Sequence, residues 1–176
     1  TTTAEVSASN TNQVIPLPMY LQARELIIQI HFVGDGMSIV SEANATLSGI
    51  TLAREIENGF PPVNGHNRPY AIRNGTIGYD FQRDNTIGQA GEEWFSAGRT
   101  LIGVDGDVNQ VLDLDVLSVV GDLGQMQHDI TGMLMGYHTE NVHEPWYIVL
   151  EIDLSVTLEM NIIDWYAGSE SWITAE

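Results

Sequence analysis

The feature that most constrains this chain is an alternation of apolar and polar residues between positions 147 and 163. In a β-strand, alternate side chains point to opposite faces, so the pattern predicts one buried face and one wet face. A helix would instead scatter the apolar residues around its whole circumference. The apolar positions are the even ones: Ile148, Leu150, Ile152, Leu154, Val156, Leu158, Met160 and Ile162.

This pattern is longer than the usual strand of about 5–6 residues. We therefore expect a bulge, a bend, or two strands that share one alternation, with the break at Ser155. The wet face favours an antiparallel sheet, because parallel sheets are usually covered on both faces.

Shorter alternating segments, bounded by turn signals, occur along the rest of the chain. Residues 24–34 alternate and end at a Gly-Asp-Gly turn, and residues 38–47 follow directly, so the two segments are predicted to form a β-hairpin. The other predicted strands cover 76–81, 93–104 and 110–120, and the two short helical candidates cover 51–59 and 129–136.

These patterns predict an all-β fold, an antiparallel β-sandwich of the transthyretin-like or Greek-key type with about seven or eight strands. We expect a flexible segment at 1–13 and a single sandwich domain over 14–176. With 176 residues, of which 43% are apolar, the chain can bury a proper core. Replacing Leu154 by Ala should cost on the order of 2–5 kcal/mol if that residue is buried. The predicted core contains the even positions from 148 to 162 with Leu26, Ile28, Ile30 and Phe32.

The charge of the chain is lopsided, because 24 acidic residues stand against 6 basic ones, all of them Arg, for a net charge of −18. Such a surface repels phosphate backbones and anionic lipids, which argues against nucleic-acid binding. It either keeps the surface solvated or steers a cationic partner. The absence of cysteine excludes disulfides, thiolate metal sites and cysteine nucleophiles. No apolar run approaches the roughly 18 residues of a membrane span, so none is expected.

A calcium loop is one candidate metal site. Asp105, Asp107 and Asn109 have the spacing of positions 1, 3 and 5 of an EF-hand loop. That loop also needs Gly at position 6 and Glu at position 12, where this chain has Gln110 and Val116. We therefore predict a hairpin turn with solvated carboxylates.

A zinc site is the second candidate. His128, His138 and His143 fall close together, with Asp129 and Glu144 beside them. The spacing between the last two histidines matches neither one face of a helix nor one face of a strand. Loop histidines are therefore the preferred interpretation.

No enzyme is predicted. Ser48-Gly49 lies outside any G-x-S-x-G nucleophile motif, and carboxylates such as Glu92 and Glu93 are expected on solvated faces. The glycosylation sequons at Asn44 and Asn74 are interpreted as accidents of composition. We expect no catalytic residue, no cofactor and no required metal.

Several short pieces, taken in order, carry a family resemblance. They are LIIQIHFVG (26–34), ANATLSGITLAREIENG (43–59), LIGVDGDVNQVLDLDV (101–116) followed by HDITGML (128–134), and YIVLEIDLSVTLEMNIIDWYAGSESWI (147–173). This order resembles the fimbrillin-like proteins (Mfa/FimB type) of Bacteroidetes-type bacteria, especially their anchor-like and tip-like members. That family has an L-S-G-hydrophobic segment after a strand, a D-hydrophobic-T segment, and a last strand ending in Asp-Trp, here Asp164-Trp165.

The resemblance implies a structural or adhesive subunit of a bacterial fimbrium, at the cell surface and associated with the outer membrane. Such a subunit would contact other fimbrial subunits by strand complementation, and host or bacterial surface ligands. The resemblance also implies that residues 45–59 cross between sheets, with Gly49 permitting the sharp departure. An ordinary β-bulge or loop glycine is the alternative. Because family members often have two domains and a lipoprotein signal, we expect one domain of a longer protein or a shorter relative, as shaft, anchor or tip.

Strand complementation uses an unpaired sheet edge, and proteins usually guard such edges with Lys, Pro or bulges. The chain has no Lys, and the wet face of 147–163 carries carboxylates and small polar groups. The donated strand would come from Thr1 to Gln13 or from the tail after Trp165. The charge predicts that the isolated chain is mostly monomeric at low salt.

A secreted binding module, for example for carbohydrate, is the alternative function. A sugar site needs exposed aromatic side chains on one face. The candidates by residue type are Trp94, Trp146, Trp165 and Trp172.

Overall fold

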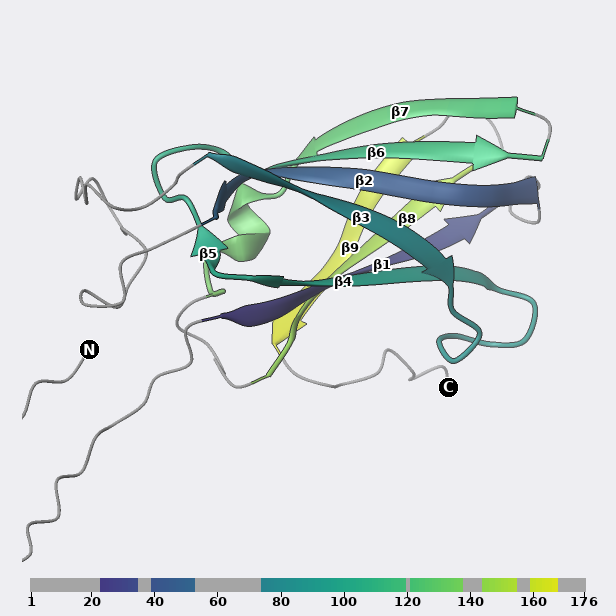
Figure 1. Ribbon diagram of the computed structural model, residues 1–176. Coiled ribbons are helices and arrows are strands. Elements are labelled where there is room, and N and C mark those ends of the chain that lie inside the picture. The colour runs from purple at the N-terminus through teal and green to yellow at the C-terminus, as the bar shows by residue number, and fades with distance from the viewer. Residues whose placement is uncertain are drawn as a thin grey trace, which may run out of the picture.

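The computed structural model describes residues 23–34, 39–52, 74–119, 121–137, 144–154 and 159–167. Almost all regular structure in these residues is strand (Figure 1), which confirms the prediction of an all-β fold. No helix in this part of the chain is long and apolar enough to cross a membrane. The elements are β1 (Arg24–Val33), β2 (Val40–Thr51), β3 (Gly75–Arg83), β4 (Glu93–Leu101), β5 (Gly103–Val104), β6 (Val111–Ser118), β7 (Gly121–Asp129), the 3-10 helix η2 (Thr131–Leu134), β8 (Trp146–Asp153) and β9 (Glu159–Ala167).

The strands form one hydrogen-bonded sheet in the order β7-β6-β2-β3-β4-β1-β8-β9, with β5 paired to β2. The sheet curls into a half-barrel, so its two halves face each other as layers (Figure 1). We name the half formed by β7, β6, β2 and β3 the β2 layer, and the half formed by β4, β1, β8 and β9 the β1 layer. Strand β3 joins them, because it pairs with β2 along most of its length and with β4 only at Gln82 and Arg83.

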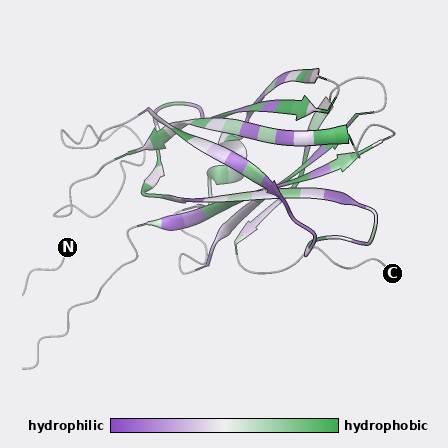
Figure 2. Cartoon of the chain, turned by 45° about the vertical axis from the view of Figure 1, so that its right-hand side comes forward, coloured by the Kyte–Doolittle hydropathy of each residue, from purple (hydrophilic) through white to green (hydrophobic). Residues whose placement is uncertain are grey.

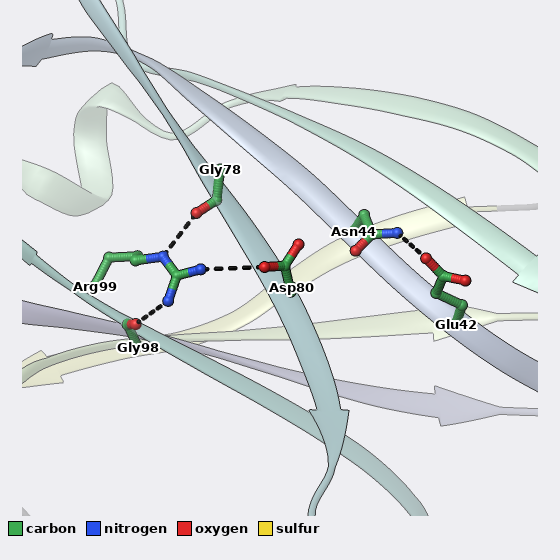
Figure 3. A network of polar contacts seen from close by, with 6 residues as sticks. All are labelled: Glu42, Asn44, Gly78, Asp80, Gly98 and Arg99. Atoms are coloured by element: carbon green, nitrogen blue, oxygen red, sulfur yellow. Dashed lines mark hydrogen bonds and ion pairs between the residues drawn. The ribbon is translucent and has the colours of Figure 1, made fainter.

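Arg99 of β4 spans the place where β3 and β4 diverge. Its Nε donates to the carbonyl oxygen of Gly78 at 2.9 Å, and its Nη2 lies 3.3 Å from Asp80 Oδ2 (Figure 3). Its Nη1 donates to the carbonyl oxygen of Gly98 at 3.4 Å. A side chain thus links the two layers where the backbone ladder between them is open.

The predicted hairpin between residues 24–34 and 38–47 is wrong. Strand β1 pairs with β4 antiparallel and with β8 in parallel, whereas β2 pairs with β3, β5 and β6 in the other layer. The chain therefore changes layers between Val33 and Val40, and the two apolar faces meet across the core. A turn signal marks where a strand ends but not which strand it pairs with. The β1–β8 pair is also the exception to the predicted antiparallel pairing.

The long alternation at 147–163 consists of two strands, which confirms one of the predicted alternatives. Strand β8 ends at Asp153, β9 begins at Glu159, and the two pair antiparallel. Residues 155–158, including the predicted break at Ser155, lie outside the described residues. Leu154 follows the end of β8 and is partly buried against the core, so the structure places this predicted core residue at the core's margin.

The core lies between the two layers, and the inward positions are those that alternation selects. Figure 2 shows hydrophilic and hydrophobic positions alternating along the strands. Met160 and Ile162 of β9 are partly buried at the margin of the core. The predicted residues Leu26, Ile28, Ile30, Phe32, Ile148, Leu150 and Ile152 are all 0% exposed, and the β2 layer adds Leu47, Tyr79, Leu112, Leu114 and Val116.

Gly49 is a β-bulge within β2, so the expected departure from the strand at Gly49 is wrong and the alternative, a β-bulge, is right. Residues 53–59 of the expected crossover lie outside the described residues. The register of β2 against β3 shifts between Ser48 and Ile50, and β2 then continues to Thr51 beside β5. Gly49 has a φ of 74°, and a β-carbon there would lie 2.3 Å from the carbonyl oxygen of Asn109. Both facts require glycine. Of the two helical candidates, 129–136 contains η2, and 53–59 lies outside the described residues.

Candidate functional site

The predicted calcium loop, residues 105–110, folds around backbone groups. Asp105 is 1% exposed, its Oδ1 accepts from the backbone N–H of Asp107, and its Oδ2 accepts from that of Asn74, both at 3.1 Å. The expectation of a solvated carboxylate at Asp105 is therefore wrong. Gln110 lies inside the loop, and its Nε2 donates to the carbonyl oxygens of Gly49, Asp105 and Val108.

The loop is tied to the segment that follows β7. The Asn109 amide donates to Asp129 Oδ2 at 2.8 Å, and Asp129 Oδ1 accepts from the backbone N–H of Thr131 at 2.9 Å. Hydrogen bonds from the Thr131 side chain and backbone hold the pKa of the Asp129 carboxyl below its usual value. Three pieces of the family resemblance, around Gly49, 105–110 and 129–131, therefore meet at one end of the sheet.

The zinc candidates are not brought together in the part of the chain that the structure describes. His128 is half-buried on β7, and Glu144 is exposed, with its backbone oxygen accepting from Arg24 Nε at 2.5 Å. His138 and His143 lie outside the described residues. Among the described residues, no group of three His, Asp or Glu side chains could hold a metal ion.

Two of the four candidate tryptophans are structural. Trp146 is 2% exposed and donates its Nε1–H to the carbonyl oxygen of Met133 at 3.0 Å. Trp94 is 4% exposed and donates to Glu92 Oε2 at 2.9 Å. Trp165 is 47% exposed on β9, and Trp172 lies outside the described residues. Of the two carboxylates considered above, Glu92 thus holds Trp94, and Glu93 forms an ion pair with Arg83.

An aromatic pair that sequence reasoning missed lies on the outer face of the β1 layer. Tyr147 and Tyr166 stack with ring centroids 4.9 Å apart and an interplanar angle of 13°. Burial, together with the nearby Glu25 carboxylate, raises the pKa of Tyr147. Asp153 opposes Glu159, so an unbroken ladder would place Trp165 opposite Tyr147, and the bulge after Ile162 brings Tyr166 there instead. No signal in the sequence marks that bulge.

The free edges of the sheet form the candidate site for assembly. Strand β7 pairs only with β6, and β9 only with β8, so each has one edge without a strand partner among the described residues. The two edge strands approach each other across the open side of the half-barrel. Their inward residues Leu123, Met160 and Ile162 are partly buried against the core. The open side therefore combines two strand edges that have no strand partner among the described residues with apolar side chains.

Both edge strands contain features that hinder unguided pairing, although the absence of Lys suggested that the edges would be unguarded. The register of β7 shifts by one extra residue at Leu123, and that of β9 by one at Ile163. Such bulges twist an edge and hinder unguided pairing. Asp129 on β7 and Asp164 on β9 add negative charge. Each edge therefore lacks a strand partner among the described residues and carries features that hinder unguided pairing.

Comparison with known proteins gives two partial structural matches. No protein-family model and no curated protein matches the chain. A "putative cell adhesion protein" from Bacteroides fragilis matches with a TM-score of 0.45 and 13% identity, over 88% of this chain and 48% of that one. Another of that description, from Bacteroides ovatus, matches with a TM-score of 0.39 and 11% identity, over 88% and 47%. This chain spans about half the length of either. At these values no shared function follows from either match.

Proposed function

We propose that this chain is a structural or adhesive subunit of a bacterial surface fimbrium that pairs with other subunits through its free strand edges. The supporting observation is that β7 and β9 end the sheet, each with one edge that has no strand partner among the described residues. An extended segment there would gain main-chain hydrogen bonds from an edge and would cover the partly buried side chains beside it. The chain would act at the cell surface, in contact with neighbouring subunits.

The charge and the bulges favour a specific partner strand over a second copy of this domain. A net charge of −18 makes two isolated domains repel each other at low salt. A donated strand that is neutral or basic would meet no such barrier. The isolated chain should therefore remain monomeric and bind an extended segment supplied by another subunit.

The test uses a matched pair of substitutions on β9 in the producing bacterium. Met160→Asp places a charge on the inward side of the free edge, and Asn161→Asp places the same charge on the exposed outer side. Met160→Asp should reduce surface fimbriae strongly, whereas Asn161→Asp should leave them at normal length and abundance. The melting temperature of each purified chain separates loss of pairing from loss of folding. Normal fimbriae from a folded Met160→Asp chain would exclude the β9 edge as an acceptor.

The donated segment is tested by deletion. Removing residues 1–13, and separately residues 167–176, asks whether either end supplies a strand. If both deletions leave fimbriae of normal length and abundance, neither end is a required donor, and the chain is better described as an adhesive module.

Carbohydrate binding is the second candidate, because Trp165 exposes 47% of its surface beside the open edge. A glycan array with the wild-type chain and a Trp165→Ala variant tests it. Binding that Trp165→Ala abolishes would favour this function, and no binding to any glycan would reject it.

A further inference from the structure

Strand β3 forms a third sheet edge where it separates from β4. The two strands pair at Gln82 and Arg83 of β3, and they diverge from there toward Gly75 (Figure 1). From Thr76 to Phe81, β3 still pairs with β2, but no described strand pairs with its other side. This stretch, residues 76–81, is therefore an edge of the β2 layer, and we name it the β3 edge.

The β3 edge directs backbone hydrogen-bonding groups toward the gap between β3 and β4. Alternate residues of a strand point their N–H and C=O groups to the same side. The backbone N–H of Asp84 donates to the carbonyl oxygen of Trp94 in β4 at 2.7 Å, so the even-numbered residues of β3 face this side. Within the β3 edge these residues are Thr76, Gly78 and Asp80.

A side chain of β4, Arg99, occupies part of this edge in place of a partner strand. Its Nε donates to the carbonyl oxygen of Gly78 at 2.9 Å, and its Nη1 donates to that of Gly98 at 3.4 Å. One guanidinium group thus binds a carbonyl oxygen from each of the two diverging strands (Figure 3). A bulge or a proline guards an edge permanently, whereas a side chain can change rotamer. The Arg99 side chain is 40% exposed, so water can replace its contacts when it leaves.

Gly78, in the middle of the β3 edge, leaves a space that the packing of the described residues does not require. A β-carbon on Gly78 would meet nothing closer than 4.0 Å, and its φ is not positive. Other glycines have a local reason: a β-carbon on Gly49 would lie 2.3 Å from the oxygen of Asn109, and one on Gly75 would lie 2.2 Å from the side chain of Leu52. Glycine weakens a strand interior and often marks a close approach of a ligand or another backbone. Gly78 therefore indicates such an approach at the β3 edge.

The charge beside the β3 edge complements a basic partner. The side chain of Asp80 is 76% exposed, and its Oδ2 lies 3.3 Å from Arg99 Nη2. When Arg99 leaves, Asp80 loses this cation. On the side of β4, the Glu25 carboxylate lies over Gly98, because a β-carbon on that glycine would be 2.7 Å from Glu25 Oε1. A Lys or Arg side chain from a partner would replace the lost charge in a chain whose net charge is −18.

We propose that the β3 edge binds an extended basic segment of another chain, which displaces Arg99 from Gly78 and pairs with residues 76–80. Alternate side chains of the segment would lie against the partly buried Ile77 on the inner side, and a Lys or Arg on the outer side would pair with Asp80. The proposal is independent of the fimbrial function and of the edges at β7 and β9, because it concerns a different part of the sheet.

The test uses the purified full chain and two blocked heptapeptides as probes. The basic peptide is Val-Thr-Val-Arg-Val-Thr-Val, and the acidic peptide has Glu in place of the central Arg. Titration calorimetry measures the affinity, and amide chemical-shift changes locate the peptide. We expect the basic peptide to shift residues 76–80 and Arg99. The acidic peptide should bind at least roughly tenfold more weakly, because its carboxylate would face Asp80.

Two matched pairs of substitutions test the proposed contacts. Gly78→Val fills the open space, and Thr46→Val places the same side chain opposite Gly78 on β2, away from the edge. Asp80→Asn removes the partner of the basic side chain, and Asp115→Asn removes the same charge on the other side of Asn44. Gly78→Val and Asp80→Asn should each weaken binding of the basic peptide by at least roughly tenfold, and the two controls should leave it unchanged. Melting temperatures report folding, and Asp80→Asn, at an exposed site, still decides the matter if Gly78→Val unfolds.

Arg99→Ala separates a removable cover from a purely structural contact. We expect this variant to bind the basic peptide severalfold more tightly than wild type, because the guanidinium no longer competes for Gly78.

Four results would overturn the proposal. The first is a folded wild-type chain that does not bind the basic peptide. The second is equal weakening by the two members of a matched pair. The third is an acidic peptide that binds as tightly as the basic one, or an Arg99→Ala variant that binds more weakly than wild type. The fourth is a set of shift changes confined to β7 or β9, which would place the peptide at the ends of the sheet instead.

Discussion

The outer faces of the two layers differ although their inner faces follow the same rule. On the β2 layer the outer side chains are solvated and bind one another: Asn44 Nδ2 donates to Glu42 Oε1 at 2.6 Å (Figure 3), and Gln127 Nε2 donates to Asp113 Oδ2 at 3.2 Å. On the β1 layer, Val149 is fully buried. The difference teaches that alternation identifies the side of a strand that faces the core, and says nothing about whether the other side meets water.

The largest expected loss of stability comes from a substitution on the inner face, which serves as the reference for the outer faces. Leu150→Ala should cost about 2–5 kcal/mol of unfolding free energy, because Leu150 is fully buried in the core. Leu154→Ala should cost less, because Leu154 is only partly buried beyond the end of β8. Denaturant unfolding of both variants measures the difference. Equal losses would mean that Leu154 belongs to the core as fully as Leu150.

The outer faces themselves are compared by truncating one residue on each. Val149→Ala should cost about 1–2 kcal/mol, because roughly 0.8 kcal/mol is lost for each buried methylene-sized group. Thr46→Ala, on the exposed face, should stay within about 0.5 kcal/mol of wild type. If the two variants unfold at the same denaturant concentration, the two outer faces are equally solvated and the comparison fails.

The side-chain contacts at the junction between the layers should contribute less to the free energy of unfolding. Arg99→Ala removes the contacts to Gly78 and Asp80, and we expect a loss of about 0.2–1 kcal/mol because both charged groups are substantially exposed to solvent. The ion-pair part of this loss should shrink at high salt, where exposed charges are screened. A larger loss that is independent of salt would show that the Gly78 contact matters more than the ion pair.

The smallest expected effect is the pH dependence from Glu92, which anchors Trp94 on the outer face of the β1 layer. The hydrogen bond from Trp94, followed by that from the Gln89 backbone, lowers the pKa of Glu92 from 4.5. A lowered pKa adds stability that is present above pH 4.5 and is lost as the pH falls through the folded-state value. Glu92→Gln should therefore give a shallower loss of stability below that pH than wild type. Parallel stability curves for the two chains would contradict this assignment.

Much of the fold was predictable because the signal is local. Period-two patterning at Leu26, Ile28, Ile30 and Phe32 correctly placed these residues in the core, since a strand alternates its faces whatever its partners are. The length of the 147–163 alternation predicted a bulge, a bend or two strands, and the structure shows that it is two strands. The structure around the site candidates was harder to predict. The burial of Asp105 and the hydrogen bond from Asn109 to Asp129 both depend on residues that are distant in sequence.

The sequence by itself determined which side of each strand is apolar and that the chain would be all β, because these properties depend only on a residue and its near neighbours. The tertiary structure decided which strands pair. In the tertiary structure, β1 pairs with β4 and β8 rather than with β2. The positions of two bulges were also decided there: one lies at Gly49 within β2, and the other places Tyr166 opposite Tyr147. It also decided that Val149 and Gln29 on one outer face are buried, whereas Thr46 on the other is exposed. Pairing, register and burial on the outer faces depend on segments that are far apart along the chain, so local alternation does not predict them.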